Sequence, residues 1–359
     1  MASKIMVISD LHLANRVNFG KPTINPTFIG CNTLFHAIAE AVNRYVDLAV
    51  KEGCEALVVP GDIWHERMIL QVPVLNAVYS LFEEANNKIP TYIMTGNHDM
   101  VSAKALYGEE GLHSLYALKQ VCNVIDNPCM TYTYSFNLCF VPFNISKDKT
   151  IADAKKLYEN SKQRLKPSVV FFHHSFEGAV TGPTNWRMPS EIKPSDVPPF
   201  DVKLSGHLHH HQTLGGITYV GSLVQHDLGE RTYSPGGLIV SDDGTWKHIP
   251  NEVSPKFVVI EAVTRKDLLL NRPQDYKVIK WLGDEKEGLE VREDMENSIV
   301  EIQSKEIKRE ARTNINNMDT IENMMKKYVT AKLGTNNEGV FTEGLSIYRN
   351  EVYNENIEF

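Results

Sequence analysis

The amino-acid sequence predicts a layered α/β fold, and three observations support this prediction. Short apolar runs typical of buried strands alternate with segments that carry apolar residues at helical spacing. The chain has 359 residues, which is enough for roughly two domains and a sizeable core. Its composition, 42% hydrophobic and 23% charged, is that of ordinary globular proteins and excludes the disordered and fibrous classes.

The predicted sheet strands occupy the chain up to about residue 240. They are Ile5–Ile8, Ala56–Val59, Thr91–Met94, Leu138–Val141, Val169–Phe172, Val202–Leu204, Ile217–Val220 and Leu238–Val240. Between the first two strands, apolar residues recur at helical spacing from Leu34 to Ala49, and Gly53 follows as a natural helix stop. The same reasoning predicts helices over Val74–Ala85 and Ile151–Arg164.

The composition changes near Pro250–Pro255, and we expect a small α+β unit after this point. Strands are predicted over Phe257–Ala262 and Tyr276–Trp281, followed by a charged helix from about Glu293 to Arg312. A last helix carries an apolar stripe formed by Met318, Ile321, Met324, Met325, Tyr328, Val329 and Leu333. Little chain remains to cover this stripe, so it either packs on its own domain or docks a partner.

Cysteine content and charge limit the classes of site and partner. None of the five cysteines is spaced as C-x-x-C, so neither a disulfide framework nor a thiolate metal site is indicated. The net charge of -8 argues weakly against a protein that coats duplex DNA, although a local basic surface can coexist with it. No run approaches the roughly 18 apolar residues of a membrane span, and the N-terminal apolar run is too short for a signal peptide. We therefore expect a soluble intracellular protein.

Polar side chains follow five of the predicted strands at the point where each strand ends. The clusters are Asp10 with His12, Asp62 with His65, Asn97 with His98 and Asp99, His173 with His174, and His207 with His209. Loops at the carboxyl ends of strands in a layered α/β sheet converge on one crevice, so these groups are expected to meet. One cluster alone is commonly a turn or a cap, but five clusters in register with strand ends predict a metal site.

The donor types limit the metal. Carboxylate and amide oxygens combined with imidazole nitrogens suit Mn²⁺, Fe²⁺ or Zn²⁺ better than Ca²⁺. The donors are too many for one ion, so we predict two ions about 3.5–4 Å apart, bridged by one carboxylate. Such a pair makes hydroxide available near neutral pH and takes up negative charge during attack on a phosphorus ester.

These motifs resemble those of the calcineurin-like metallophosphoesterase superfamily, over about Lys4 to Asp242. They occur in the order D-x-H, G-D, G-N-H-D, a strand-end His and G-H-x-H. Two details are similar to the nuclease subunit of double-strand-break repair, of the bacterial SbcD type and its phage recombination-endonuclease relatives. One is His65, three residues after Asp62. The other is the segment from Tyr219 to Gly237, which is similar to the Y-x-G-S…E…G pattern.

This resemblance implies the domain organisation. We expect a layered β-sandwich flanked by helices, the metallophosphoesterase fold, over residues 1–250. A small α+β capping domain over residues 251–312 and a helical tail over residues 313–359 are expected to follow. In that family the tail docks an SMC-like coiled-coil ATPase subunit.

The resemblance also implies which residues hold the two ions. One ion is expected at Asp10, His12, Asp62 and His209. The other is expected at Asp62, Asn97, His173 and His207, with Asp62 as the bridge. Only one residue of the His173–His174 pair can face the crevice, and we prefer His173 because it comes first after the apolar run.

Three further residues receive roles from the same resemblance. His98 is expected to protonate the leaving oxygen or stabilise the transition state, and Asp99 to orient His98 through its other ring nitrogen. His65 is expected beside the phosphate, as an acid or a supporting group. The other histidines are expected at the surface or are given no role: His210 and His211 in the first group, and His36, His113, His226 and His248 in the second.

One long loop is a candidate nucleic-acid contact. The segment from Ala14 to Gly30 contains Arg16 and Lys21, together with Phe19 and Phe28. Such a composition can track a phosphate backbone and stack bases. The loop is otherwise simply solvated, and the sequence leaves both readings open.

The sequence and the resemblance together predict a DNA nuclease subunit that uses Mn²⁺, with Fe²⁺ or Zn²⁺ as alternatives. We expect a homodimer, with helix Val74–Ala85 as a candidate dimer element, that acts with an SMC-like ATPase in DNA end processing, recombination or repair. Its location is expected to be the cytoplasm, that of the host if the chain is phage-encoded. Two alternatives stay open: a phosphodiesterase or phosphatase acting on small substrates or phosphoproteins, and a DNA-end-binding scaffold with weak catalysis.

Overall fold

The structure is a computed structural model that describes residues 2–16, 20–102, 113–182, 184, 186–269, 272–295, 298–302, 320–333 and 337–351. The chain divides into two compact units, Met1–Ile302 and Gln303–Phe359.

The first sheet of the larger unit has six strands in the order β14-β13-β1-β2-β3-β4. Their bounds are β1 Lys4–Ile8, β2 Cys54–Val59, β3 Thr91–Met94, β4 Asn123–Ile125, β13 Gly236–Ser241 and β14 Trp246–Pro250. Strands β1 to β4 run parallel, whereas β13 is antiparallel to β1 and β14 is antiparallel to β13. The carboxyl ends of β1, β2 and β3 therefore lie at one edge of this sheet.

The second sheet also has six strands, in the order β11-β12-β10-β7-β6-β5. Their bounds are β5 Cys129–Tyr132, β6 Asn137–Val141, β7 Ser168–Phe172, β10 Val202–Ser205, β11 Gln212–Leu214 and β12 Ile217–Tyr219. The four central strands are parallel and the outer two antiparallel to their neighbours. A two-stranded sheet is formed by β8 Val180–Thr181 and β9 Trp186–Arg187.

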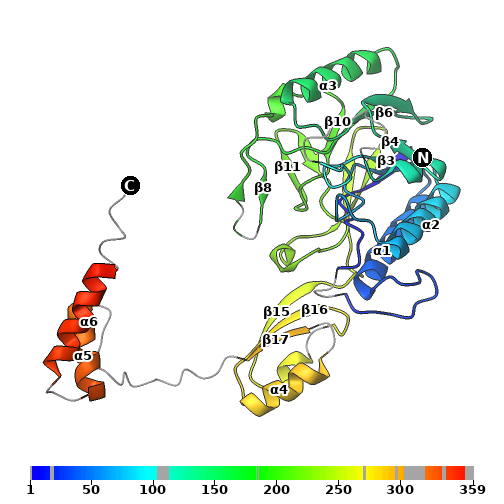
Figure 1. Ribbon diagram of the computed structural model, residues 1–359. Helices are drawn as coiled ribbons and strands as arrows, with labels where there is room; N and C mark the ends of the chain where they lie inside the picture. Colours follow the sequence, from blue (N-terminus) through cyan, green and yellow to red (C-terminus); the bar gives the residue numbers. More distant parts are fainter. Residues whose placement is uncertain are drawn as a thin grey trace. The chain divides into compact units, whose positions relative to one another are not determined.

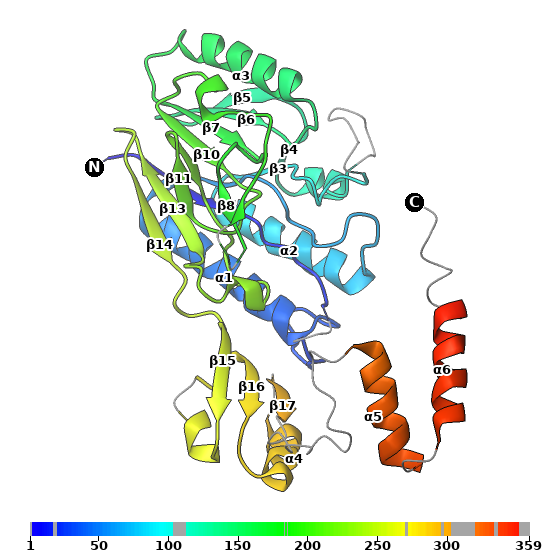
Figure 2. The ribbon, with the colours of Figure 1, turned by 90° about the vertical axis from the view of Figure 1, so that its left-hand side faces the viewer.

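The two six-stranded sheets form a sandwich between helices, and three apolar cores lie between the layers. Alternate residues of β1 face opposite sides: Ile5 and Val7 lie in the core between the two sheets, whereas Met6 and Ile8 lie in the core beneath two helices. These helices are α1 Thr33–Lys51 and α2 Val72–Lys88, which lie side by side, and α3 Lys147–Ser161 covers the outer face of the second sheet (Figures 1 and 2). The predicted layered β-sandwich flanked by helices is confirmed.

The ends of α1 follow the chemistry of the sequence. The side chain of Asn32 caps the helix by accepting a hydrogen bond from the Phe35 amide at 2.9 Å. Gly53 follows the helix with a φ of 68°, a backbone conformation that favours glycine. The predicted start and stop of this helix are therefore close to those observed. Short 3₁₀ turns occur at Tyr116–Gln120, Pro194–Asp196, Leu228–Glu230 and Arg265–Leu268.

A third, parallel sheet completes the larger unit, with the order β15-β16-β17. Strands β15 Phe257–Ala262 and β16 Tyr276–Trp281 agree with the prediction, and α4 Glu285–Asp294 packs on a core around the buried Trp281. The predicted helix from Glu293 to Arg312 is wrong over its first part, because β17 occupies Ser298–Ile302. Burial alternates along β17, as it does in a half-buried strand, and the surrounding charges concealed this period in the sequence. Residues 303–312 lie outside the described residues.

The smaller unit contains α5 Ile321–Leu333 and α6 Glu338–Glu351, which pack against each other. The predicted last helix corresponds to α5, and Met318 lies outside the described residues. Helix α6 falls within the predicted helical tail, but it was not predicted as a separate helix. None of the described residues of α5 is buried. Five large apolar side chains are exposed on the two helices: Ile321, Tyr328, Leu333, Val340 and Ile347. The predicted domain boundaries stay predictions.

No helix in the described part of the chain is long and apolar enough to span a membrane.

Candidate dimetal site

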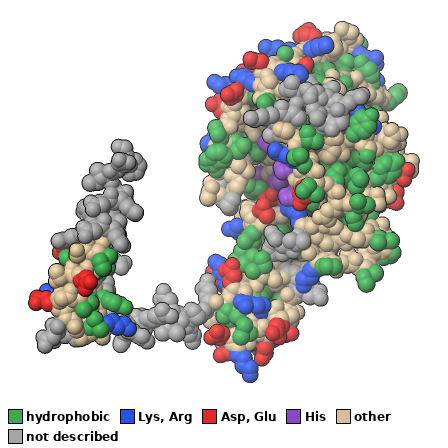
Figure 3. All heavy atoms as spheres, in the orientation of Figure 1, with side chains coloured by type: hydrophobic (Ala, Val, Ile, Leu, Met, Phe, Trp, Pro, Cys, Tyr) green, Lys and Arg blue, Asp and Glu red, His purple; other side chains and the backbone are tan. Residues whose placement is uncertain are grey.

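Five loops bring the predicted residues together at the carboxyl ends of β1, β2, β3, β7 and β10. Three groups of metal-binding side chains have ligand atoms that all lie within 4.8 Å of one another. They are Asp10, His12 and His209; His12, Asp62 and His98; and Asp62, His173 and His207. Figure 3 shows histidine side chains gathered in a hollow on one face of the molecule, with basic and acidic side chains beside them.

The backbone at this edge is held in an unusual conformation. Asp10, His12, Asp62 and His207 have φ values of 52°, 47°, 56° and 81°, and among the described residues no other non-glycine has a positive φ. Such a conformation costs about 1–3 kcal/mol per residue and is retained where the surroundings enforce it. Here the His12 amide donates to the Asp62 carbonyl at 3.0 Å, and the His207 amide donates to the Asp10 carboxylate at 2.9 Å. All four strained residues are predicted ligands.

The first cluster consists of Asp10, His12 and His209. It is centred on two imidazole nitrogens that face each other. Nε2 of His12 lies 3.0 Å from Nε2 of His209, in a partly buried setting. Burial lowers the pKa of His12 well below its ordinary value. Burial acts on His209 in the same direction, but the Glu230 carboxylate bonded to its Nδ1 outweighs it and raises the pKa of His209 to about 9. Among the described residues, Nδ1 of His12 has no hydrogen-bond partner.

The second cluster consists of Asp62, His173 and His207, and its imidazoles surround Asn97. The side-chain oxygen of Asn97 lies 3.0 Å from Nε2 of His173 and 2.8 Å from Nδ1 of His207. Nδ1 of His173 lies 2.7 Å from the Pro60 carbonyl and therefore donates to it, so Nε2 is the ring atom that faces the cluster. Burial disfavours the charged form of His173, but the Asp62 carboxylate outweighs burial and raises its pKa to about 9.

Asp62 is shared by the two clusters. Its Oδ2 lies 3.6 Å from Nε2 of His12 and 3.1 Å from Nε2 of His173, while its Oδ1 accepts a hydrogen bond from the His98 amide at 2.8 Å. The donor atoms are carboxylate and amide oxygens with imidazole nitrogens, and within each group the ligand atoms of the Asp and His side chains lie within 4.8 Å of one another. This donor set fits two divalent cations with Asp62 between them.

His98 and His65 lie over the first cluster. The ring of His98 is 4.7 Å from that of His12 and 6.1 Å from that of His65, nearly parallel to the latter. Nδ1 of His98 donates to the His65 carbonyl at 2.7 Å, which leaves Nε2 free of this bond. Burial, followed by the positive charge of Arg16, lowers the pKa of His65 to about 4.

The expectation that Asp99 orients His98 is wrong. The Asp99 carboxylate is buried beneath the second metal loop, where it accepts hydrogen bonds from the amides of Gly96, Asp62, Ile63 and Trp64 at 2.8–3.2 Å. These amides have no partner within their own turn, so the carboxylate is drawn under the loop instead of toward the His98 ring. Burial raises the pKa of Asp99 to about 7. Asp99 thus supports the loop that carries Asp62.

Four other histidines near the site belong to none of the metal-binding groups among the described residues. His174 points away from the clusters, and its Nε2 lies 3.2 Å from the Asn144 amide. His210 stacks on Tyr233 with ring centroids 4.6 Å apart. His211 stacks on His248 at 4.1 Å, and neither His210 nor His211 belongs to a metal-binding group.

Two residues next to the clusters received no functional role from sequence reasoning. Glu230 bonds to His209 and to the His226 amide, and the buried His226 ring lies 5.1 Å from the rings of both His12 and His209. Glu230 carried a signal, since it belongs to the segment quoted for the family resemblance. His226 carried none, because nothing in its local sequence points to a site.

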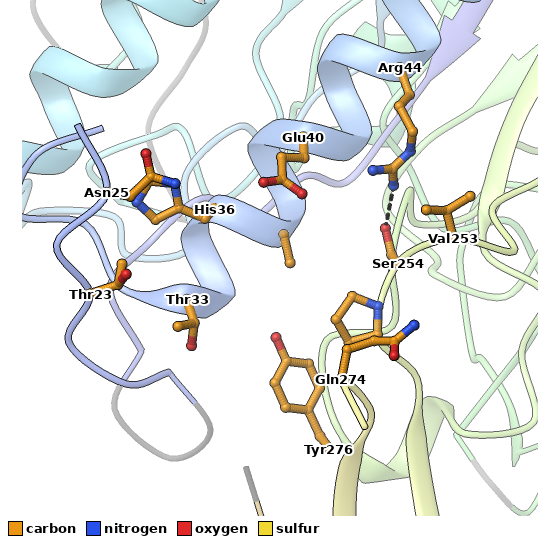
Figure 4. Close-up of a pocket in the computed structure, with 12 residues that line it drawn as sticks. Thr23, Asn25, Thr33, His36, Glu40, Arg44, Val253, Ser254, Gln274 and Tyr276 are labelled. Atoms are coloured by element: carbon orange, nitrogen blue, oxygen red, sulfur yellow. Dashed lines mark hydrogen bonds between the residues drawn. The ribbon is translucent and has the colours of Figure 1, made fainter. Parts of the chain in front are cut away.

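A separate cavity of about 320 Å³ lies between the start of α1, the segment 253–255 and the start of β16 (Figure 4). Arg44 donates to Ser254 at 2.8 Å across it, and Tyr276 and Glu40 also line it. None of the predicted metal or catalytic residues does so. The predicted site and this cavity are therefore different features of the larger unit.

Three curated proteins illustrate what the chain is similar to. "Putative phosphoesterase 244L" of Invertebrate iridescent virus 6 is 27% identical over 210 residues, covering 57% of this chain and 71% of the viral protein. "Putative phosphoesterase 078R" of Invertebrate iridescent virus 3 is 24% identical over 243 residues, covering 65% and 67%. The DNA double-strand break repair protein Mre11 of Archaeoglobus fulgidus is 24% identical over 243 residues, covering 62% and 54%.

A solved structure and a family profile complete the comparison. The crystal structure of a dimetal phosphatase from Danio rerio aligns with a TM-score of 0.39 and 11% identity, covering 69% of this chain and 99% of that chain. The profile described as "Calcineurin-like phosphoesterase" matches residues 3–211, which include all the loops of the two clusters. This match spans more than half of the sequence, so the chain belongs to the calcineurin-like phosphoesterase family, a family of metal-dependent enzymes with a dinuclear site.

Proposed function

We propose that this phosphoesterase is a DNA nuclease that hydrolyses phosphodiester bonds at the dimetal site. The observation that carries the proposal is the pair His65 and His98, whose rings lie 6.1 Å apart over the first cluster. His65 is the residue that sets the motif apart as similar to double-strand-break-repair nucleases. The similarity to an archaeal Mre11 protein supports the same substrate class.

The predicted ligands would hold the two ions in two sets that share Asp62. Asp10, His12, Asp62 and His209 would hold one ion, and Asp62, Asn97, His173 and His207 the other. When bound, such a pair of ions lowers the pKa of water and stabilises developing negative charge. We expect Mn²⁺ in both positions, with Fe²⁺ or Zn²⁺ as alternatives, because the donors are oxygens and imidazoles.

His98 is the proposed proton donor to the leaving oxygen. Its Nδ1 is committed to the His65 carbonyl, so Nε2 is the atom that reaches the substrate. Histidine commonly transfers protons near neutral pH. Glu230 holds His209 through Nδ1, which keeps Nε2 of that ring directed at the first cluster.

A second copy of this chain is the proposed partner of the surface at the start of α2. Met68, Ile69 and Val72 are 79%, 70% and 67% exposed. Three large apolar side chains within five consecutive residues favour a protein contact over solvent. This segment directly follows His65, so a homodimer formed here would bring two dimetal sites near its interface.

An SMC-like coiled-coil ATPase is the proposed partner of the smaller unit. Two helices that bury none of the described residues of α5 cannot form a core of their own. The exposed Tyr328 and Leu333 of α5 and Ile347 of α6 offer apolar anchors to a partner helix. Removal of residues 313–359 is expected to abolish ATPase binding in a pull-down and to leave the metal content unchanged.

The test of the nuclease proposal compares the wild type with His98→Ala, and uses His248→Ala as a matched control outside both clusters. Each protein receives linear duplex DNA, single-stranded DNA and bis-p-nitrophenyl phosphate, with Mn²⁺, Mg²⁺ or a chelator. We expect Mn²⁺-dependent DNA cleavage by the wild type and the control. His98→Ala is expected to keep its metal and to lose at least about 100-fold in rate.

Two results would refute the proposal. If the wild type hydrolyses only the small ester, even with an ATPase partner present, the chain is a small-substrate phosphodiesterase or phosphatase. If it binds DNA ends and metal but hydrolyses neither substrate, it is a scaffold.

A further inference from the structure

Arg16 follows the first metal loop and is held by a residue that no metal-binding motif includes. Its Nη2 lies 3.2 Å from Nδ1 of His226, and Nε2 of His226 lies 2.8 Å from the Asp10 carbonyl oxygen. A carbonyl only accepts hydrogen bonds, so Nε2 of His226 carries the proton and Nδ1 accepts from the guanidinium. The two contacts fix one tautomer of a neutral imidazole.

This contact places the Arg16 side chain beside the dimetal site. The His226 ring lies 5.1 Å from the rings of His12 and His209, so one imidazole separates the guanidinium from the first cluster. Arg16 also lies close enough to His65 for its positive charge to lower the pKa of that imidazole, in addition to the effect of burial. The guanidinium therefore lies within electrostatic reach of both His65 and the first cluster.

The charge of Arg16 is oriented but not neutralised. Within the described ranges it forms no ion pair with a carboxylate, and its buried Nε has no hydrogen-bond partner. Glu230, the carboxylate that acts most strongly on Arg16, is already bonded to His209 and to the His226 amide. A partly exposed guanidinium whose charge no described carboxylate pairs with, and whose hydrogen-bond anchor is a neutral imidazole, is suited to bind an anion.

We propose that Arg16 binds a non-bridging oxygen of the substrate phosphate at the dimetal site, with His226 as its positioning residue. The inference rests on the proposed phosphodiester substrate and names the residue that recognises its charge. A guanidinium offers two parallel N–H donors to a phosphate, which a lysine cannot do. It also agrees with one of the two readings that the sequence left open for the loop from Ala14 to Gly30, a contact with phosphate.

The test compares Arg16→Gln and Arg16→Lys with Arg231→Gln, a matched control on an exposed arginine that donates only to the Leu228 carbonyl among the described residues. Two quantities are measured: KM and kcat for bis-p-nitrophenyl phosphate with Mn²⁺, and the affinity of metal-free protein for inorganic phosphate by calorimetry. Metal content and melting temperature are recorded for each variant.

We expect Arg16→Gln to raise KM and to weaken phosphate binding by about 10–100-fold, the worth of one hydrogen bond to a charged group, with a smaller change in kcat. Arg16→Lys should recover part of the loss, and guanidinium ion added to Arg16→Ala should recover part of it too. A His226→Phe change should weaken phosphate binding in the wild type and add little in Arg16→Gln.

The inference is overturned if folded Arg16→Gln has the KM and phosphate affinity of the wild type. It is also overturned if Arg231→Gln is impaired equally, because the effect is then one of general charge. If Arg16→Gln fails to fold, the same quantities in Arg16→Lys decide. Neither readout uses DNA, so failure of the nuclease proposal and failure of this inference are separate outcomes.

Discussion

Replacing Asp99 by Asn is expected to destabilise the larger unit and to reduce its metal content. Oδ2 of Asp99 accepts from the Asp62 and Gly96 amides, and Oδ1 accepts from the Ile63 and Trp64 amides. Asparagine replaces one oxygen by an NH₂ group, which cannot accept, so two buried amides lose their partner in either orientation. Each unsatisfied buried donor costs about 1–3 kcal/mol, and the expected loss of unfolding free energy is about 2–6 kcal/mol.

The assay is urea unfolding at pH 8, where the Asp99 carboxyl with its pKa of about 7 is ionised. Tryptophan fluorescence follows unfolding, and the midpoint is compared at a constant slope. Asp243→Asn is the control, since Asp243 also accepts from a backbone amide and a hydroxyl but is exposed, and little change is expected there. A midpoint for Asp99→Asn equal to that of the wild type would refute the view that this carboxylate supports the second metal loop.

Three further predictions concern the same loops. Removing metal with a chelator should lower the melting temperature of the protein. A metal concentration 100 times its Kd should restore about 2.7 kcal/mol of unfolding free energy. A melting curve that does not depend on metal would contradict the proposal that these residues bind metal. Glu230→Gln should weaken metal binding about 10–100-fold by releasing Nδ1 of His209, measured by competition with a chelating dye, and unchanged affinity argues against this role. Gly61→Ala should unfold the metal loop, since Gly61 has a φ of 103° and an added Cβ would clash with Nδ1 of His173. Circular dichroism and metal content measure this effect. Values equal to those of the wild type in both measurements would be incompatible with the observed backbone.

Much of the fold could be predicted because its strands are buried on both faces. Runs such as Ile5–Ile8 and Val169–Phe172 are continuously apolar, since one layer covers each side of the sheet. Strand β17 escaped prediction because its outer face is exposed and charged, so the segment Ser298–Ile302 lacks such a run. Helix α6 was predicted only as part of a helical tail and not as a separate helix, since none of its described apolar residues is buried.

The sequence by itself determined which residues come together at the site, because the metal-binding side chains follow directly after apolar strands. Only the tertiary structure decided how they are oriented and supported. The contact of His226 with Asp10 joins residues 216 positions apart, and that of His209 with Glu230 depends on where a turn folds back. The position of Asp99 under the second metal loop depends on which amides lack a partner once the loops are in place. Hydrogen bonds of this kind follow from three-dimensional proximity and leave no periodic pattern in the chain.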